Sequence, residues 1–110
     1  MKLLSRNDEL MLLAVWRLQS DAYAVTVRDE VQRMTGKQWS FGSIFVTLDR
    51  LSRKGHLKSR LGDPTPERGG KRKRFYELSG SGRRALIEIR RLEETIWEGV
   101  SEQALKRATS

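Results

Sequence analysis

One segment restricts the possible folds of this chain most strongly, the stretch from Gly62 to Gly70. Its nine residues include three glycines and two prolines, a composition that cannot continue a helix. On one side of it, Leu57–Leu61 alternates apolar and basic residues, and on the other side Lys73–Leu78 alternates more loosely. Alternation of this kind is typical of strands. The sequence therefore predicts a β-hairpin with a long, basic loop.

A first helix is predicted ahead of the hairpin. Ser5 and Asp8 have the spacing of a capping box, and the apolar run 10–16 follows, so the helix should end near Leu18. Because this helix is apolar nearly all round, it must be covered on more than one side, which a monomer of 110 residues would find difficult to arrange. A short extended piece is expected at residues 23–25.

A second helix is predicted after Thr26, which has Asp29 three residues later, again at capping-box spacing. Apolar residues then recur at helical spacing, and Gly36 is expected to end the helix. The recurring residues are Val27, Val31 and Met34.

Ser40 can cap a third helix that runs to about Lys54 and ends at Gly55. Its inner face is predicted to consist of Phe41, Ile44, Leu48 and Leu51. Its opposite face is predicted to carry small polar residues followed by cations, namely Ser43, Thr47, Arg50 and Lys54. A helix with such an outer face can enter a groove of a nucleic acid.

After the punctuation at 79–82, a last helix of about 18 residues, about 27 Å long, is predicted, with frayed residues from Glu102 onward. Its apolar residues are spaced three or four apart and so form a stripe along one face of the helix. This stripe is too long for one compact domain to cover. We therefore expect a homodimer through this helix. The expected interface residues are Leu86, Ile89, Leu92, Ile96, Trp97 and Val100.

Positive charge is concentrated in one part of the chain. The formal net charge is +8, and residues 50–74 hold ten basic and two acidic side chains, while the other 85 residues hold twelve of each. Solubility would need charge of either sign anywhere, whereas one sign in one place favours a polyanionic partner.

The sequence gives little support for catalysis or cofactor binding. It contains no cysteine and a single histidine, His56, with no second ligand at metal spacing, so neither a metal nor another cofactor is expected. No nucleophile and base pair stands out, and no apolar stretch approaches the roughly 20 residues of a membrane span. A non-enzymatic cytoplasmic protein is therefore expected.

Three helices followed by a basic hairpin are the order of a winged helix-turn-helix. The predicted fold class is mainly α with a small β-hairpin, in which residues 1–80 bind double-stranded DNA and residues 81–110 form a C-terminal dimerisation helix and tail. Both parts are expected to form one compact unit. The third helix would read the major groove, and the hairpin loop would contact the flanking backbone or minor groove. The expected DNA-binding residues are Ser40, Ser43, Thr47, Arg50, Lys54, Arg68, Lys71, Arg72 and Lys73.

Several segments, in this order and spacing, resemble the PadR family of bacterial transcriptional regulators over roughly residues 8–100. They are Asp21–Val25, Thr47–Leu51 with Lys54-Gly55, Arg68–Leu78 and Gly82–Leu86. The resemblance implies a homodimeric winged-helix repressor of the group with a single short C-terminal helix, binding an inverted-repeat operator. Phe45 stands where the family usually has a tyrosine, so no hydroxyl contact to phosphate is expected there.

The resemblance also implies a small aromatic effector bound between the last and first helices of the dimer, which points to Trp16 and Trp97. The alternative is that both tryptophans fill the dimer interface. Other functions remain open from the residues alone: a winged-helix RNA-binding or ribosome-associated protein would use the same basic hairpin without a dimer, and a protein interaction module would not need the concentrated charge.

Overall fold

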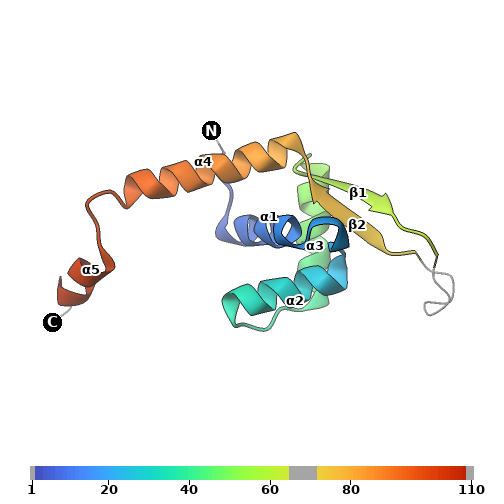
Figure 1. Ribbon diagram of the computed structural model, residues 1–110, viewed down its shortest axis with the longest axis horizontal. Coiled ribbons are helices and arrows are strands. Elements are labelled where there is room, and N and C mark those ends of the chain that lie inside the picture. Colours follow the sequence, from blue (N-terminus) through green and yellow to red (C-terminus); the bar gives the residue numbers. More distant parts are fainter. Residues whose placement is uncertain (1, 65–71, 109–110) are drawn as a thin grey trace.

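Three helices, a two-stranded hairpin and two more helices follow one another along the chain in the computed structural model, which describes residues 2–64 and 72–108 (Figure 1). The predicted fold class, mainly α with a small β-hairpin, is confirmed. The elements are α1 (Arg6–Leu18), the 3-10 turn η1 (Gln19–Asp21), α2 (Ala24–Thr35), α3 (Phe41–Arg53), β1 (Leu57–Leu61), β2 (Arg74–Leu78), α4 (Gly80–Ile96) and α5 (Glu102–Ala108).

Serine hydroxyls cap α1, α3 and α4, and α5 likewise, because a side-chain oxygen there can accept a backbone N–H that has no partner within the helix. Ser5 accepts from the Asp8 N–H (3.1 Å) at α1 and Ser40 from the Ser43 N–H (3.1 Å) at α3. Ser79 accepts from the Gly82 N–H (3.0 Å) at α4. The expected starts of α1, α3 and α4 are therefore confirmed to within a few residues.

The start of α2 differs from the prediction. Tyr23 is the N-cap and has extended backbone, but Ala24 and Val25 are already helical, so the extended piece expected at 23–25 is confirmed only for its first residue. Thr26 does not precede the helix but lies in its first turn, where its hydroxyl accepts the Tyr23 N–H (3.0 Å). Capping-box chemistry is thus present, with threonine in the position usually taken by glutamate or glutamine. The helix ends as expected at Gly36, which adopts φ +69°.

The hydrophobic core lies where α1, α2, α3 and the base of the hairpin meet. Ion pairs support it at the edge, where Glu30 on α2 is bound by Arg17 of α1 (2.8 Å) and by Arg33. The Arg33 hydrogen bond lowers the pKa of the Glu30 carboxyl to about 2, although burial by itself would raise it. The core residues include Met11, Leu12, Val15, Val27, Val31, Ile44, Leu48, Leu51, Leu57 and Leu78.

The hairpin is antiparallel, with Leu57 opposite Leu78 and Leu61 opposite Arg74. Its base is anchored because Leu57 and Leu78 are buried and because the Tyr76 N–H donates to the carbonyl of Ala22 (2.8 Å). β1 has the predicted bounds, and β2 starts one residue later than predicted. The loop cations Arg68 and Lys71 lie outside the described residues.

The start of α4 is clamped onto the turn between α3 and β1. The Ser79 hydroxyl donates to the Gly55 carbonyl (2.6 Å), the Ser79 N–H donates to the His56 carbonyl (3.1 Å), and His56 Nδ1 lies 2.9 Å from the Ser81 hydroxyl. Gly82 approaches so closely that a Cβ there would lie 2.2 Å from the His56 carbonyl oxygen. We name this contact the α4 joint.

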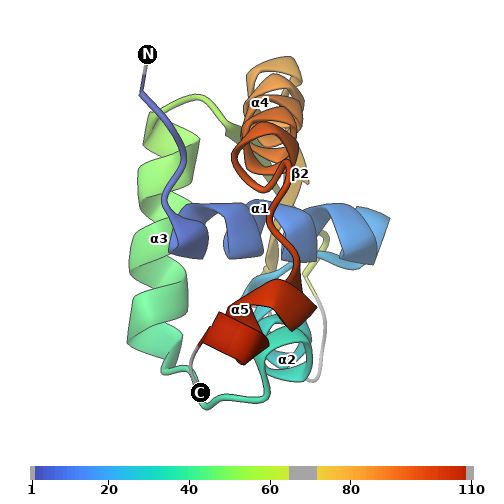
Figure 2. The same cartoon turned by 90° about the vertical axis from the view of Figure 1, so that its left-hand side faces the viewer.

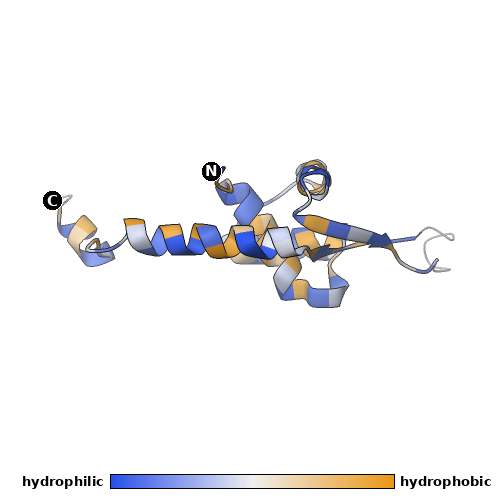
Figure 3. Ribbon diagram, turned by 90° about the horizontal axis from the view of Figure 1, so that it is seen from above, coloured by the Kyte–Doolittle hydropathy of each residue, from blue (hydrophilic) through white to orange (hydrophobic). Residues whose placement is uncertain are grey.

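Beyond the joint, α4 leaves the core, and with α5 it makes the molecule elongated (Figures 1 and 3). The radius of gyration is 16.9 Å, against about 13 Å for a compact chain of this length. Residues from Glu102 onward were expected to fray, which is wrong for residues 102–108, since these form α5. Ser101 accepts the Ala104 N–H (3.0 Å) and Lys106 pairs with Glu102 (3.1 Å), so local contacts support this short helix.

Candidate nucleic-acid interface

The exposed face of α3 is fixed by the residues on its buried side. Ile44, Leu48 and Leu51 are fully buried, as predicted, so the line farthest from the core passes through positions 42, 46, 49 and 53. Those residues are Gly42, Val46, Asp49 and Arg53, and all four are exposed. This outward line carries one apolar side chain and one ion pair, between Arg53 and Asp49 (3.0 Å).

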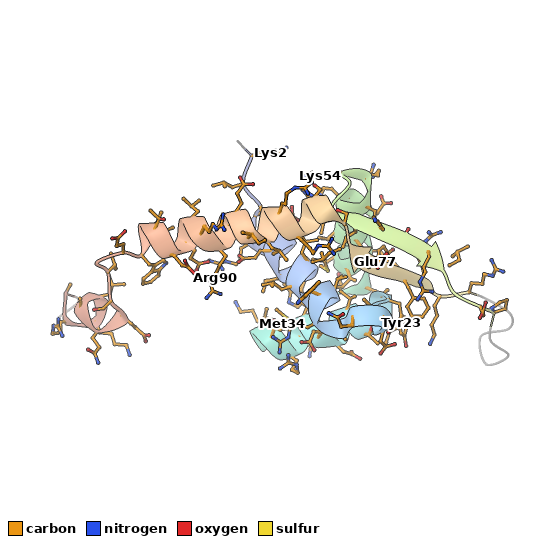
Figure 4. All side chains as sticks on the ribbon, turned by 45° about the horizontal axis from the view of Figure 1, so that its top comes forward. Lys2, Tyr23, Met34, Lys54, Glu77 and Arg90 are labelled. Carbon is orange, nitrogen blue, oxygen red and sulfur yellow. The ribbon has the colours of Figure 1, made fainter. Side chains whose placement is uncertain are left out.

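The outer face predicted for α3 is partly wrong. Thr47 is only 8% exposed, since it lies between Ile44 and Leu51 on the helix surface, whereas Ser43 and Lys54 are exposed as expected. Phe41, expected in the core, is 39% exposed and carries the Arg28 guanidinium 4.3 Å above its ring. Lys54 extends from the C-terminal end of α3 near the start of α4 (Figure 4).

Arg50 is held by the protein itself. Its two terminal nitrogens lie 2.7 and 2.9 Å from the two carboxylate oxygens of Asp8, which is buried at the start of α1. The Arg50 hydrogen bond lowers the pKa of the Asp8 carboxyl below its ordinary value, against the effect of burial. The spacing of Asp8 from Ser5 predicted only a capping role for it, and residues 42 positions apart gave no local signal of this pair. Arg50 thus connects α3 to α1.

Replacing Asp8 with asparagine is expected to destabilise the fold by about 2 kcal/mol at pH 7, because Arg50 loses a charged partner. Since the folded pKa of Asp8 is depressed, its stabilising effect is present above the unfolded value of 3.8 and is lost as the pH falls through the folded value. Urea unfolding of D8N and of the unmodified chain should therefore converge in acid. A constant difference in stability down to low pH would contradict this assignment.

The turn that leads into α3 is ordered by side chains of α2. Arg28 Nε donates to the carbonyl of Trp39 (2.6 Å), and the Trp39 N–H donates to Oε1 of Gln32 (2.9 Å). The Trp39 indole donates to Thr35 (3.3 Å) and packs against the core. Trp39 therefore holds the N-terminus of α3 in place, and Ser40, the cap, stays exposed.

The hairpin carries further cations, and only three residues separate its first strand from α3. Arg72 is exposed ahead of β2, and the Lys73 amine lies 4.3 Å above the ring of Tyr23. On β1, the Arg60 guanidinium lies 4.8 Å above the ring of Phe75. The charged groups of two hairpin cations thus lie over aromatic rings.

The two tryptophans singled out for an effector do not share a groove. Trp16 lines a groove between the end of α1 and the hairpin, together with Lys58, Arg60 and Arg83. Trp97 lines another groove, between the segment before α1 and the far half of α4, with Leu4 and Ile96.

Within the described chain, no helix has the length and apolar character needed to span a membrane.

Several solved structures share this fold, and two of them are PadR family regulators. A PadR family transcription regulator from Clostridium difficile R20291 is 22% identical, with a TM-score of 0.68, and the alignment covers 92% of this chain and 99% of that one. A PadR family regulator from Eggerthella lenta DSM 2243 is 21% identical, with a TM-score of 0.66, over 86% of this chain and 80% of that one. RosR of H. salinarum is 17% identical, with a TM-score of 0.70, over 96% of this chain and 88% of that one. Identities this low show the shared fold.

The sequence itself gives the family. No curated protein matches it closely, but the model of the transcriptional regulator PadR-like family matches residues 12–88, which is more than half of the chain. That range runs from α1 to the first half of α4 and includes α3, the hairpin and the α4 joint. The resemblance expected from the sequence is confirmed, and the chain belongs to the PadR-like family of transcriptional regulators.

Proposed function

We propose that this chain is a sequence-specific DNA-binding repressor that acts in the cytoplasm as a homodimer on an inverted-repeat operator. The observation that carries the proposal is the position of the positive charge. The segment 50–74 contains the whole net charge of +8, and its described residues form the end of α3 and the hairpin. Cations at these two places can contact phosphates on both sides of a helix inserted in the major groove.

We assign α3 and the hairpin different roles in DNA binding: α3 reads the major groove, and the hairpin contacts the phosphate backbone. Ser40 and Ser43 at the N-terminal end of α3, and Lys54 at its C-terminal end, are exposed and are proposed DNA contacts. Arg50 is proposed to position α3 through Asp8, with the remaining exposed part of its side chain free to approach DNA. Arg72 and Lys73, together with Arg68 and Lys71, are proposed phosphate contacts.

The proposed dimer rests on exposed apolar residues along the part of α4 that leaves the core. The exposed Ile96 continues the line of the half-buried Leu86, Ile89 and Leu92 to the end of α4, where Trp97 is the C-cap, and the exposed Val100 follows after the helix has ended. A stripe of this kind is stable in water only when covered, and a second copy of α4 is the matching surface. Residues 1–80 then act as the DNA-binding domain and residues 81–110 as the dimerisation helix and tail.

DNA binding is tested with three probes: duplex DNA from upstream of the protein's own gene, a scrambled duplex and a structured RNA. Each is titrated at several salt concentrations. Preference for the first duplex is the expected result. Equal binding to all three would contradict sequence-specific recognition, and preference for the RNA would favour a winged-helix RNA-binding protein. Adding planar aromatic compounds while following tryptophan fluorescence and DNA release tests for an effector at Trp16 or Trp97.

Lys73→Ala is expected to weaken operator and scrambled DNA alike and to reduce the slope of log K against log salt by about one unit, because one phosphate contact is lost. Arg90→Ala is the matched control, since it removes one positive charge from α4, where Arg90 pairs with Glu94 away from the hairpin (Figure 4). Its salt slope should not change. If both variants reduce the slope equally, the effect comes from net charge, and the hairpin assignment fails.

A further inference from the structure

The exposed face of α3 carries an apolar patch that the fold itself does not use. It consists of Phe41, Phe45 and Val46, which are 39%, 54% and 65% exposed. The rings of Phe41 and Phe45 lie 6.4 Å apart, so the patch is continuous along the first two turns of the helix. The inner face of α3 is already complete without these residues, since Ile44, Leu48 and Leu51 fill the core.

The surroundings of this α3 patch indicate what kind of surface would cover it. Arg28 lies over Phe41, and Asp49 is paired with Arg53, so the one carboxylate on the outward line has a cation beside it. Ser40 and Ser43 add hydroxyls next to the patch, and hairpin cations follow at the other end of α3. An apolar strip within a cationic frame is complementary to a partner that combines negative charge with small apolar groups.

The DNA major groove has this combination. Its walls are phosphates, and the C5-methyl group of thymine is the apolar group that base edges present there. A second copy of this chain is a poorer candidate, because α3 lies along one flank of the molecule and the end of α4 lies away from it (Figure 2). The apolar stripe proposed for the dimer is on α4, not on α3.

Gly42 is a second, independent observation on the same line. Glycine has a lower helix propensity than alanine, by about 1 kcal/mol in a helix interior, and Gly42 lies in the first turn of α3. The protein does not require glycine here, because an added Cβ would have only the Ser40 hydroxyl near it, at 3.9 Å. Gly42 lies one turn before Val46 on the outward line, so its lack of a side chain leaves room for a partner to approach the helix backbone.

We propose that Phe45 and Val46 read sequence by contacting thymine C5-methyl groups in the major groove, with Gly42 allowing the close approach. The proposal rests on the proposed DNA-binding function and refines it. The specificity of the chain then comes mainly from apolar contacts on α3, and its polar and cationic residues fix the register on the phosphates. Operators should contain thymines at the positions that face Phe45 and Val46.

The experiment uses duplexes selected by the full-length protein from a random-sequence library. In a selected duplex, each thymine is replaced in turn by deoxyuridine, which removes only the methyl group and keeps the base-pairing edge. One or two positions in each half-site are expected to lose about fourfold in affinity, the value of one methyl group withdrawn from water. The Val46→Ala and Phe45→Ala variants should bind the thymine duplex more weakly and lose this sensitivity at their own positions.

Val25→Ala is the matched control, because it also shortens an exposed valine, on α2 and away from the outward line of α3. It should leave affinity and deoxyuridine sensitivity unchanged. Specific duplexes whose binding ignores every deoxyuridine, or sensitivity that persists in both α3 variants, would overturn this inference and leave sequence-specific DNA binding intact. Failure to select any duplex over random DNA would instead contradict the proposed function. The deoxyuridine scan on the unmodified protein decides even if a variant fails to fold.

Discussion

Ile96→Asp is expected to convert the protein from a dimer to a monomer and to lower operator affinity by at least about 100-fold, because two linked half-sites are replaced by one. Ile96 is 62% exposed and lies outside the hydrophobic core, so the fold of each chain should survive. Leu92→Asp should act in the same direction, but Leu92 is half-buried within the chain. Sedimentation at micromolar concentration and operator titration measure the two effects.

Thr95→Asp is the control for this variant, since it introduces the same charge one residue earlier, on a different face of α4. It should leave both the association state and the affinity unchanged. An unmodified protein that sediments as a monomer at micromolar concentration would overturn the dimer outright, and an Ile96→Asp protein that remains a dimer would place the interface elsewhere.

Gly82→Ala is expected to destabilise the fold by about 3 kcal/mol and to lower the melting temperature by roughly 10 °C. Alanine would otherwise improve the helix, but its Cβ would lie 2.2 Å from the backbone oxygen of His56 in the α4 joint. The Cβ at position 82 and the His56 oxygen are both held by the backbone, so they can separate only if α4 moves away from the turn. Thermal unfolding followed by circular dichroism measures the change.

The control for this substitution lies two residues away. Gly80→Ala places its Cβ 3.3 Å from the terminal nitrogen of Arg84, a flexible side chain that can move. This variant should be as stable as the unmodified protein or slightly more stable. If both alanines have the same effect, the close approach at Gly82 has no energetic consequence.

Much of the fold could be predicted because its signals are local. Ser5, Ser40 and Ser79 cap helices through backbone groups three residues away, and the alternation around Gly62–Gly70 indicates the hairpin. The apolar spacing on α4 predicted a helix of about the observed length. Each of these features depends on neighbours in sequence, so a single chain is enough to find them.

The orientation of α3 was harder to predict because polarity and geometry disagree there. Thr47 is polar, which favoured an outward position, yet at 100° per residue it lies only 60° from Ile44 and 40° from Leu51, which places it inside. Val46 is apolar and faces outward. The usual correlation between polarity and exposure fails on a surface suited to a partner. The positions of Ile44, Leu48 and Leu51 alone would have given the outward face of α3 correctly.

Sequence patterns could not predict the contacts between residues far apart in the chain. The Asp8–Arg50 pair joins α1 to α3, and the Gly82 approach depends on a backbone oxygen contributed by a distant turn. Arg68 and Lys71, predicted as DNA contacts, lie outside the described residues, so their part in the interface stays a prediction.

The α4 joint has a consequence for the spacing of half-sites. In the proposed dimer, α4 connects the interface to the end of α3 without a flexible linker, since Ser79, Ser81 and Gly82 are fixed directly on the turn after α3. The joint therefore fixes the direction of α3 relative to α4 within each chain of the proposed dimer. One extra base pair between half-sites moves the second site by about 3.4 Å and turns it by about 34° around the DNA axis. We therefore expect the operator affinity of the proposed dimer to fall when the spacing between half-sites changes by one base pair.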